Sequence, residues 1–175
     1  MALESLSVTL KNLWNFTIGK AATEICSGSA SGAANTTKTL TFGITVGKAN
    51  QLFADTFQIN ASGTKVMALG GSQGDAIANA FGETITFTMI KALRIVNEGS
   101  VPIEIFGHAT YDPAALVKAS TDALILPAYT SLQLIAYSAV EGYDSWAIAA
   151  NDVLNIKNLS GLVGAVVSVE VVGLE

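Results

Sequence analysis

The chain has 175 residues and a net charge of −5, and 13% of its residues are charged while 50% are apolar. Arg94 is the only arginine, so the clustered positive charge that nucleic acid requires is missing and we expect no nucleic-acid partner. The single cysteine, Cys26, excludes an intrachain disulfide scaffold, and the length suits one domain whose low charge leaves apolar surface for contacts between subunits.

The first residues show no targeting signal. The start, "MALESLSVTLKNLW", lacks a basic stretch followed by an uninterrupted apolar stretch, so it does not fit a signal peptide. The sequence also lacks a run of about 18 apolar residues, the length that a membrane-spanning helix requires. We therefore expect synthesis in a cytosol and no membrane partner.

Residues 1–38 differ in composition from the rest of the chain. Their second part, "CSGSASGAANTTK" (26–38), is small and polar, which is typical of a flexible or extended connector. Apolar residues alternate at strand spacing from Leu6 to Ile18, although leucines spaced three and four apart fit a helix as well. We expect this segment to be either the first strand of the main domain or an arm that docks on a neighbour. Residues 39–175 are expected to form the domain itself.

The rest of the chain is dominated by a period of two. "TLTFGITV" (39–46), for example, has apolar residues at positions 40, 42, 44 and 46 between threonines and glycine. Such alternation predicts antiparallel strands with one face in a core and the other toward water or a neighbour. The same pattern predicts strands at 83–90, 131–138, 145–150, 152–158 and 164–173.

Asparagine and glycine mark the turns between these strands. Each of three stretches places an Asn two or three residues before a Gly between two alternating runs: "INASGT" (59–64), "VNEGS" (96–100) and "KNLSG" (157–161). Asn and Gly supply the positive φ values that tight turns need. We therefore predict three β-hairpins, one around each of these turns.

Two short stretches carry helix signals. "GDAIANAFG" (74–82) offers Asp75 as a cap, and "DPAALVKAS" (112–120) places Pro113 at a first helical position. Both lie between predicted strands, so we expect helical turns that cross an end of a sheet. With roughly eight to ten strands, the chain is predicted to be an all-β, antiparallel, jelly-roll-like β-sandwich with one or two short connecting helical turns.

Residues able to carry out chemistry are scattered along the chain. His108 is the only histidine, and its context "FGHATYDP" lacks the cysteine or serine that would mark a nucleophile, so we interpret it as a polar residue at a strand end. A hydrolase would require a cleft in which His108 meets a carboxylate or a serine. Zinc would require carboxylates to complete a site that one His and one Cys cannot fill.

The acidic residues of the predicted loops fit structural roles. Aspartate is favoured there for turns and caps, as at Asp112, Asp122, Asp144 and Asp152. The stretch 141–152 combines acidic residues with Tyr143 and Trp146, as calcium and sugar sites do, but Trp146 fits a core position equally well. We predict no catalytic residues, no cofactor and no metal site, and expect that the protein is not an enzyme.

Several strand and turn patterns resemble the compact jelly-roll virion proteins of tailed bacteriophages. In that family an "I-K-x-L-x-I-x-N" strand, here 90–97, precedes a hairpin, a loop and an "L-x-I-x-N" strand, here 154–158. The chain then closes on an alternating strand that ends in Gly. The likeness spans residues 39–173 and does not cover the first 38 residues. It is carried by "FGITVGKANQLFADTFQINASGT", "GETITFTMIKALRIVNEGSVPIEIFG" and "DVLNIKNLSGLVGAVVSVEVVG".

The resemblance implies a capsid decoration (cement) protein, usually a homotrimer, that binds the major capsid protein on the virion surface after synthesis in the bacterial cytoplasm. Low charge and threonine-rich strand faces are compatible with such assembly. The resemblance transfers no binding residues. The alternative is a tail-associated or receptor-binding jelly roll that recognises host-surface glycans through aromatic and acidic loop residues, namely Tyr111, Tyr129, Tyr143 and Asp144.

Overall fold

The computed structural model describes residues 7–19, 29–42, 48–79, 81–106, 123–136 and 146–175. Within these ranges the secondary structure is entirely β, with fourteen strands and no helix. It follows that no helix in the described part is long and apolar enough to cross a membrane. The predicted all-β fold is confirmed, and the helical turn predicted at 112–120 lies outside the described residues.

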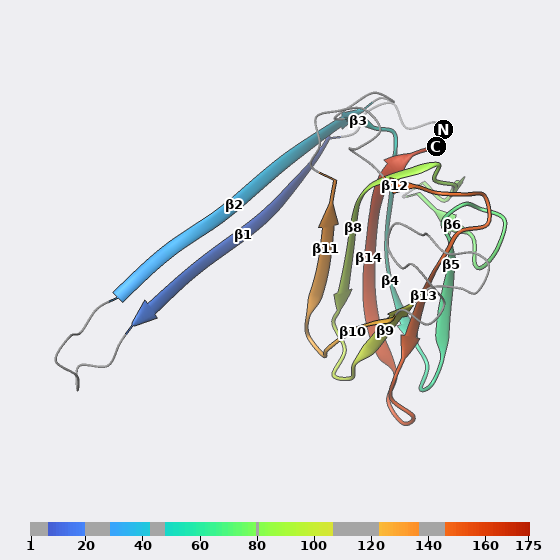
Figure 1. Ribbon diagram of the computed structural model, residues 1–175. Helices are drawn as coiled ribbons and strands as arrows, with labels where there is room; N and C mark the ends of the chain where they lie inside the picture. The colour runs from blue at the N-terminus through green and yellow to red at the C-terminus, as the bar shows by residue number, and fades with distance from the viewer. Residues whose placement is uncertain (1–6, 20–28, 43–47, 80, 107–122, 137–145) are drawn as a thin grey trace.

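Eight strands form two antiparallel sheets that pack face to face as a sandwich (Figure 1). Sheet I has, in order of neighbours, β11 (Ser131–Ile135), β8 (Met89–Asn97), β14 (Ala165–Leu174) and β4 (Gln51–Ile59). Sheet II has β10 (Ala123–Leu126), β9 (Ile103–Phe106), β13 (Val153–Asn158) and β5 (Thr64–Ala68). A short strand, β12 (Trp146–Ala147), pairs with the start of β8.

Four pairs of successive strands cross from one sheet to the other, whereas β9 and β10 pair side by side in sheet II. β4 and β5 lie in different sheets, and the same holds for the successive pairs β8 and β9, β10 and β11, and β13 and β14. Eight strands wound in this way through two sheets form a jelly roll. The three predicted hairpins are therefore wrong in their pairing, because the turns near Asn60, Asn97 and Asn158 join strands that face each other across the core.

The core confirms the predicted alternation of burial. Along β14, Val167, Val169 and Val171 have no exposed surface, while the residues between them are partly exposed. Each predicted strand contains strand residues, although 83–90 is split between β7 (Thr84–Ile85) and the start of β8. The two sheets thus enclose one apolar layer lined by the inward positions of every sandwich strand.

The helical turn predicted at 74–82 is wrong. Ile77 instead belongs to β6 (Ile77–Ala78), where it pairs with Ile85 of β7, and both isoleucines are buried in the main core. The Oδ1 atom of Asn79 accepts hydrogen bonds from the backbone N–H groups of Phe81 (2.9 Å) and Glu83 (3.1 Å), which closes a tight turn. Burial of apolar side chains on two short strands thus outweighs the weak local helix preference.

Asn97, the last residue of β8, is fully buried and fastens two of the crossing turns. Its Nδ2 group donates to the carbonyl oxygens of Val101 (2.8 Å), Leu126 (3.2 Å) and Pro127 (2.9 Å). Its Oδ1 atom accepts from the N–H group of Gly99 (3.2 Å). One side chain therefore joins the turn after β8 to the turn after β10.

Asn158, the last residue of β13, repeats this arrangement for the other two crossing turns. It is also fully buried, and its Nδ2 group donates to the carbonyl oxygens of Ile59 (3.2 Å), Asn60 (3.1 Å) and Val163 (2.7 Å). Its Oδ1 atom accepts from the N–H group of Ser160 (2.9 Å). The two asparagines thus close the same end of the sandwich, the lower end in Figure 1.

A long hairpin leaves the opposite end of the sandwich and forms the arm, which we define as β1 (Ser7–Gly19) and β2 (Ser29–Phe42). Figure 1 shows the arm standing apart from the sandwich over most of its length. Residues 29–38, which we expected to be part of a connector, belong to β2 and pair with β1. The boundary between an N-terminal segment and a main domain at residue 38 stays a prediction.

The root of the arm is attached to the outer face of sheet I. β2 pairs in parallel with β3 (Lys48–Ala49), and Leu40 and Ala49 have no exposed surface. They pack with Ala92 and Val172, whose positions alternate with the core-facing ones in β8 and β14. This small second cluster fixes where the arm begins.

We expect Asn158→Ala to lower the free energy of unfolding by about 3 kcal/mol, because buried backbone carbonyls lose their donor. Asn97→Ala should have a similar effect, whereas Asn151→Ala, at an exposed turn position, should change stability by less than about 0.5 kcal/mol. Urea denaturation of the three variants measures this. Equal stability of all three would show that the buried amides do not hold the turns.

A second prediction concerns Gly173, which lies where the pairing of β14 with β8 shifts register. A Cβ atom there would overlap the carbonyl oxygen of Met89 and lie 2.7 Å from Cδ1 of Phe87. We expect Gly173→Ala to destabilise the protein by about 2 to 3 kcal/mol. Gly161→Ala is the matched control, since its nearest heavy atom would be 3.8 Å away. Equal melting temperatures for the two variants would contradict the prediction.

Candidate functional site

Three of the residues considered from sequence lie in the described part, and they do not meet. Asp152 is buried, and its Oδ2 atom accepts from the N–H group of Ala149 (2.8 Å), which is the turn role expected of it. Trp146 is partly buried against the main core, and Tyr129 is 73% exposed in the turn after β10. The other candidates lie outside the described residues, namely Cys26, His108, Tyr111, Asp112, Asp122, Tyr143 and Asp144.

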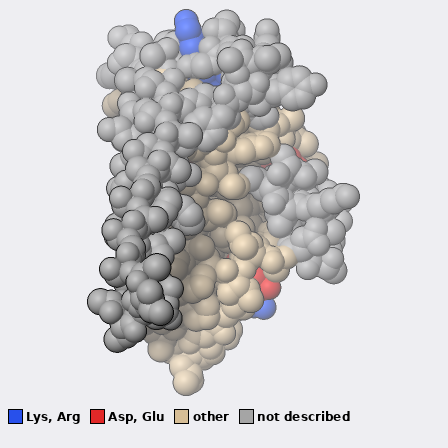
Figure 2. All heavy atoms as spheres, turned by 60° about the vertical axis from the view of Figure 1, so that its left-hand side comes forward, with Lys and Arg blue, Asp and Glu red and all other residues tan. Residues whose placement is uncertain are grey.

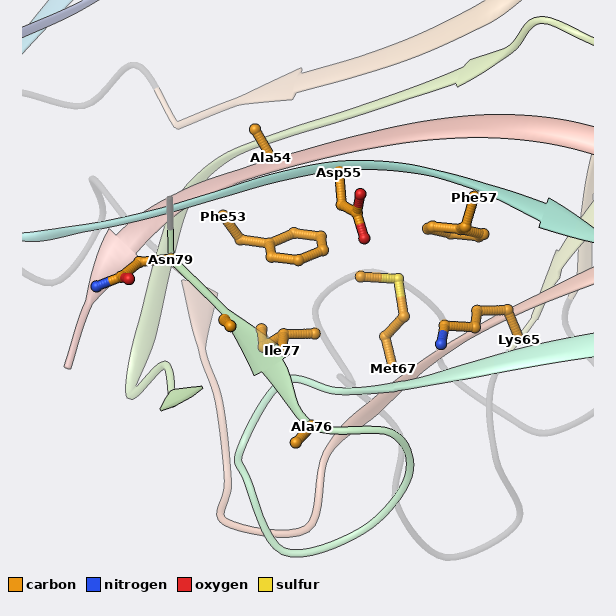
Figure 3. A pocket seen from close by; sticks show the side chains of 10 residues that line it. Phe53, Ala54, Asp55, Phe57, Lys65, Met67, Ala76, Ile77 and Asn79 are labelled. Carbon is orange, nitrogen blue, oxygen red and sulfur yellow. The ribbon is translucent and has the colours of Figure 1, made fainter. Parts of the chain in front are cut away.

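The structure instead reveals a hollow of about 300 Å³ beside β4, β5 and β6, shown in Figure 3. Its floor is apolar, since Phe53, Met67 and Ile77 belong to the buried core. At its mouth lie the exposed carboxylate of Asp55 and the partly exposed side chain of Lys65. The period of two did not reveal this hollow, because it depends on β6, which we predicted as a helical turn.

Polar contacts at the hollow are local. Lys65 Nζ donates to Asp75 Oδ2 at 2.7 Å and lies 5.7 Å from the centre of the Phe57 ring. The described residues that line the hollow include no serine, cysteine or histidine. Within the described ranges, no group of three or more His, Cys, Asp or Glu residues is placed to hold a metal ion. An apolar floor with a carboxylate at its mouth suits contact with a short apolar segment that carries a hydrogen-bond donor.

The outer face of sheet I is polar along its middle. Arg94 NH1 donates to Glu170 Oε1 at 2.7 Å across β8 and β14. Ser168 Oγ donates to Glu98 Oε1 at 2.6 Å and lies 2.6 Å from Thr56 Oγ1. These groups are exposed and satisfy one another, so this face resembles an ordinary hydrated sheet surface.

The side of the sandwich formed by β10 and β11 has a different character. These two strands end their sheets on that side, and neither has a second strand partner among the described residues. Leu124 is 44% exposed and Ile125 is 58% exposed, while Leu132 and Leu134 are partly exposed where they pack against the core. Exposed apolar residues on unpaired edge strands are typical of a protein interface.

Charge is scarce on this side. The stretch "ALILPAYTSLQLI" (123–135), which forms β10, its turn and β11, contains no charged residue. Figure 2 turns the left-hand side of Figure 1 forward, and the described atoms visible there are almost all uncharged. The sequence already carried this signal, but we interpreted 131–138 only as a strand and did not predict an exposed edge.

No model of a known protein family matches the chain, and no curated protein matches it. Among solved structures, the chain is similar to the decameric BFDV capsid protein, with 10% sequence identity, 97% of each chain covered and a TM-score of 0.25. That neighbour is a viral capsid protein, but a similarity at this TM-score supports no argument. The jelly-roll assignment therefore rests on the strand order of this chain.

Proposed function

We propose that this protein is a non-enzymatic virion structural protein that decorates the outer surface of a tailed-phage capsid and reinforces it through subunit contacts. The observation that carries the proposal is the combination of a jelly-roll sandwich with a long arm that stands clear of it. Jelly rolls serve as viral capsid domains, among other roles. Because the hairpin stands apart from its own sandwich over most of its length (Figure 1), it suits contact with another molecule.

The chemistry of the surface supports the same role. The chain is poor in charge, and its uncharged β10–β11 side offers an apolar contact surface beside a polar sheet face. Proteins that add many identical copies to a shell need such surfaces for closed, symmetric contacts. We propose a homotrimer bound to the major capsid protein, located on the virion and made in the bacterial cytoplasm.

Recognition of host glycans by a tail-associated jelly roll is the second candidate. One observation favours it: Tyr129 is 73% exposed in the β10–β11 turn. An exposed aromatic ring offers a plane on which a sugar can stack. Saturable glycan binding that is lost in Tyr129→Ala would favour this role over decoration.

The proposal predicts where the protein is found and in what number. Quantitative mass spectrometry of purified virions should detect the chain in a copy number comparable to that of the major capsid protein. Immunogold labelling should mark the head and not the tail. A few copies per particle, labelling of the tail tip, or absence from virions would contradict the decoration role.

A further inference from the structure

The pairing register gives the arm two different faces. β1 and β2 pair antiparallel so that even-numbered residues lie opposite even-numbered ones, as in Val8 with Leu40 and Phe16 with Gly32. Because successive residues of a strand alternate between faces, all even positions share one face. That even face carries Val8, Leu10, Trp14, Phe16 and Ile18. The odd face carries mostly Ser, Thr and Asn.

The even face includes the residue that attaches the arm to its own sandwich. Leu40 lies on this face and is fully buried at the arm root against Ala92 and Val172 of sheet I. Further along β1, the even register positions are those of Trp14, Phe16 and Ile18. The even positions of the ribbon therefore run from the buried root at Leu40 along strands that stand apart from the sandwich over most of their length (Figure 1).

A two-stranded ribbon of this kind needs a surface to pack on. An isolated hairpin is marginally stable in water, and it becomes stable when a third strand or another apolar layer covers it. β1 has 13 residues, so the arm is about 43 Å long at the usual rise of a strand. It is longer than any strand of the sandwich, of which β14 is the longest with 10 residues.

We propose that the arm of one copy docks on the β10–β11 side of a second copy of this chain. That side offers the third strand and the apolar layer that a two-stranded ribbon needs, because β10 and β11 are edge strands and Leu124 and Ile125 are exposed. The inference rests on the proposed role as an assembling virion protein and names the partner of the arm. Because each copy both gives and receives an arm, the contact is heterologous, and it forms a ring where the rotation between successive copies closes.

Charge favours a second copy as the occupant. Each chain has a net charge of −5, so copies repel one another except where acidic residues are absent. β1 and β2 contain no acidic residue, and their only charged residues are Lys11 and Lys38. The receiving stretch 123–135 contains no charge at all. The two surfaces that would meet are therefore those that two copies can bring together without repulsion.

The test uses two full-length variants, each defective in one half of the contact. The arm variant carries Trp14→Asp and Phe16→Asp, and the receiving variant carries Ile125→Asp. We expect the wild type to form a closed multimer, with a trimer as the expected size, and each variant alone to be a single chain of 18.1 kDa in native mass spectrometry. An equimolar mixture should contain a two-chain complex, because one intact arm then meets one intact receiving side.

Matched controls separate docking from misfolding. Asn15→Asp adds the same charge to the odd face of the arm, and Leu162→Asp adds it to a residue that is 93% exposed in the loop after β13. Both control variants should form an assembly with the same number of chains as the wild type. All variants should keep the wild-type melting temperature of the sandwich.

Other outcomes overturn the inference. These are a monomeric wild type, unchanged assembly in both defective variants, or a mixture that contains only single chains. Capsids are not needed for these measurements. A failure of the arm to dock on a second copy can therefore be distinguished from a failure of the decoration role, which would appear as absence of the protein from virions.

Discussion

Two buried carboxamides hold the jelly roll closed at one end, and the path of the chain depends on them. Asn97 and Asn158 each donate to three backbone carbonyls that belong to two different turns. All four turns cross from one sheet to the other, so each side chain ties together two connections between the sheets. A polar group with no exposed surface is tolerated there because the carboxamide satisfies backbone groups that would otherwise be buried without partners.

These two contacts also reveal an internal twofold relation. The strands correspond in pairs: β8 to β13, β9 to β14, β10 to β4 and β11 to β5. When the members of each pair are exchanged, the strand order of sheet I becomes that of sheet II. The same exchange converts the surroundings of Asn97 into those of Asn158. Each asparagine ends a strand, and its Oδ1 atom accepts an N–H bond from the residue two positions later. The "L-x-I-x-N" pattern therefore occurs at 93–97 and again at 154–158 because each copy forms a strand that ends in a buried, turn-binding asparagine.

Strand positions were predictable from the sequence, but strand partners were not. Alternation reports which face of a strand is buried, and that face is the same whether the next strand lies beside it or across the core. Asn97 and Asn158 suggested tight hairpin turns because asparagine favours turns, yet they act through side chains buried between sheets. At 74–82 the pairing of Ile77 with Ile85 replaced the expected helical turn, and the hollow beside β6 was missed with it. No local pattern contains these contacts between distant segments.

The twofold relation makes the difference between the two open sides of the sandwich informative. On one side the edge of β5 is covered, because Asp75 bridges to Met67 and pairs with Lys65, and β6 packs beside it. On the related side, β11 is the counterpart of β5 and pairs only with β8 among the described residues, and β10 beside it leaves Leu124 and Ile125 exposed. A covered edge at β5, an unpaired edge at its counterpart β11 and a long ribbon that stands apart from the sandwich together suit the proposed docking of the arm on another copy.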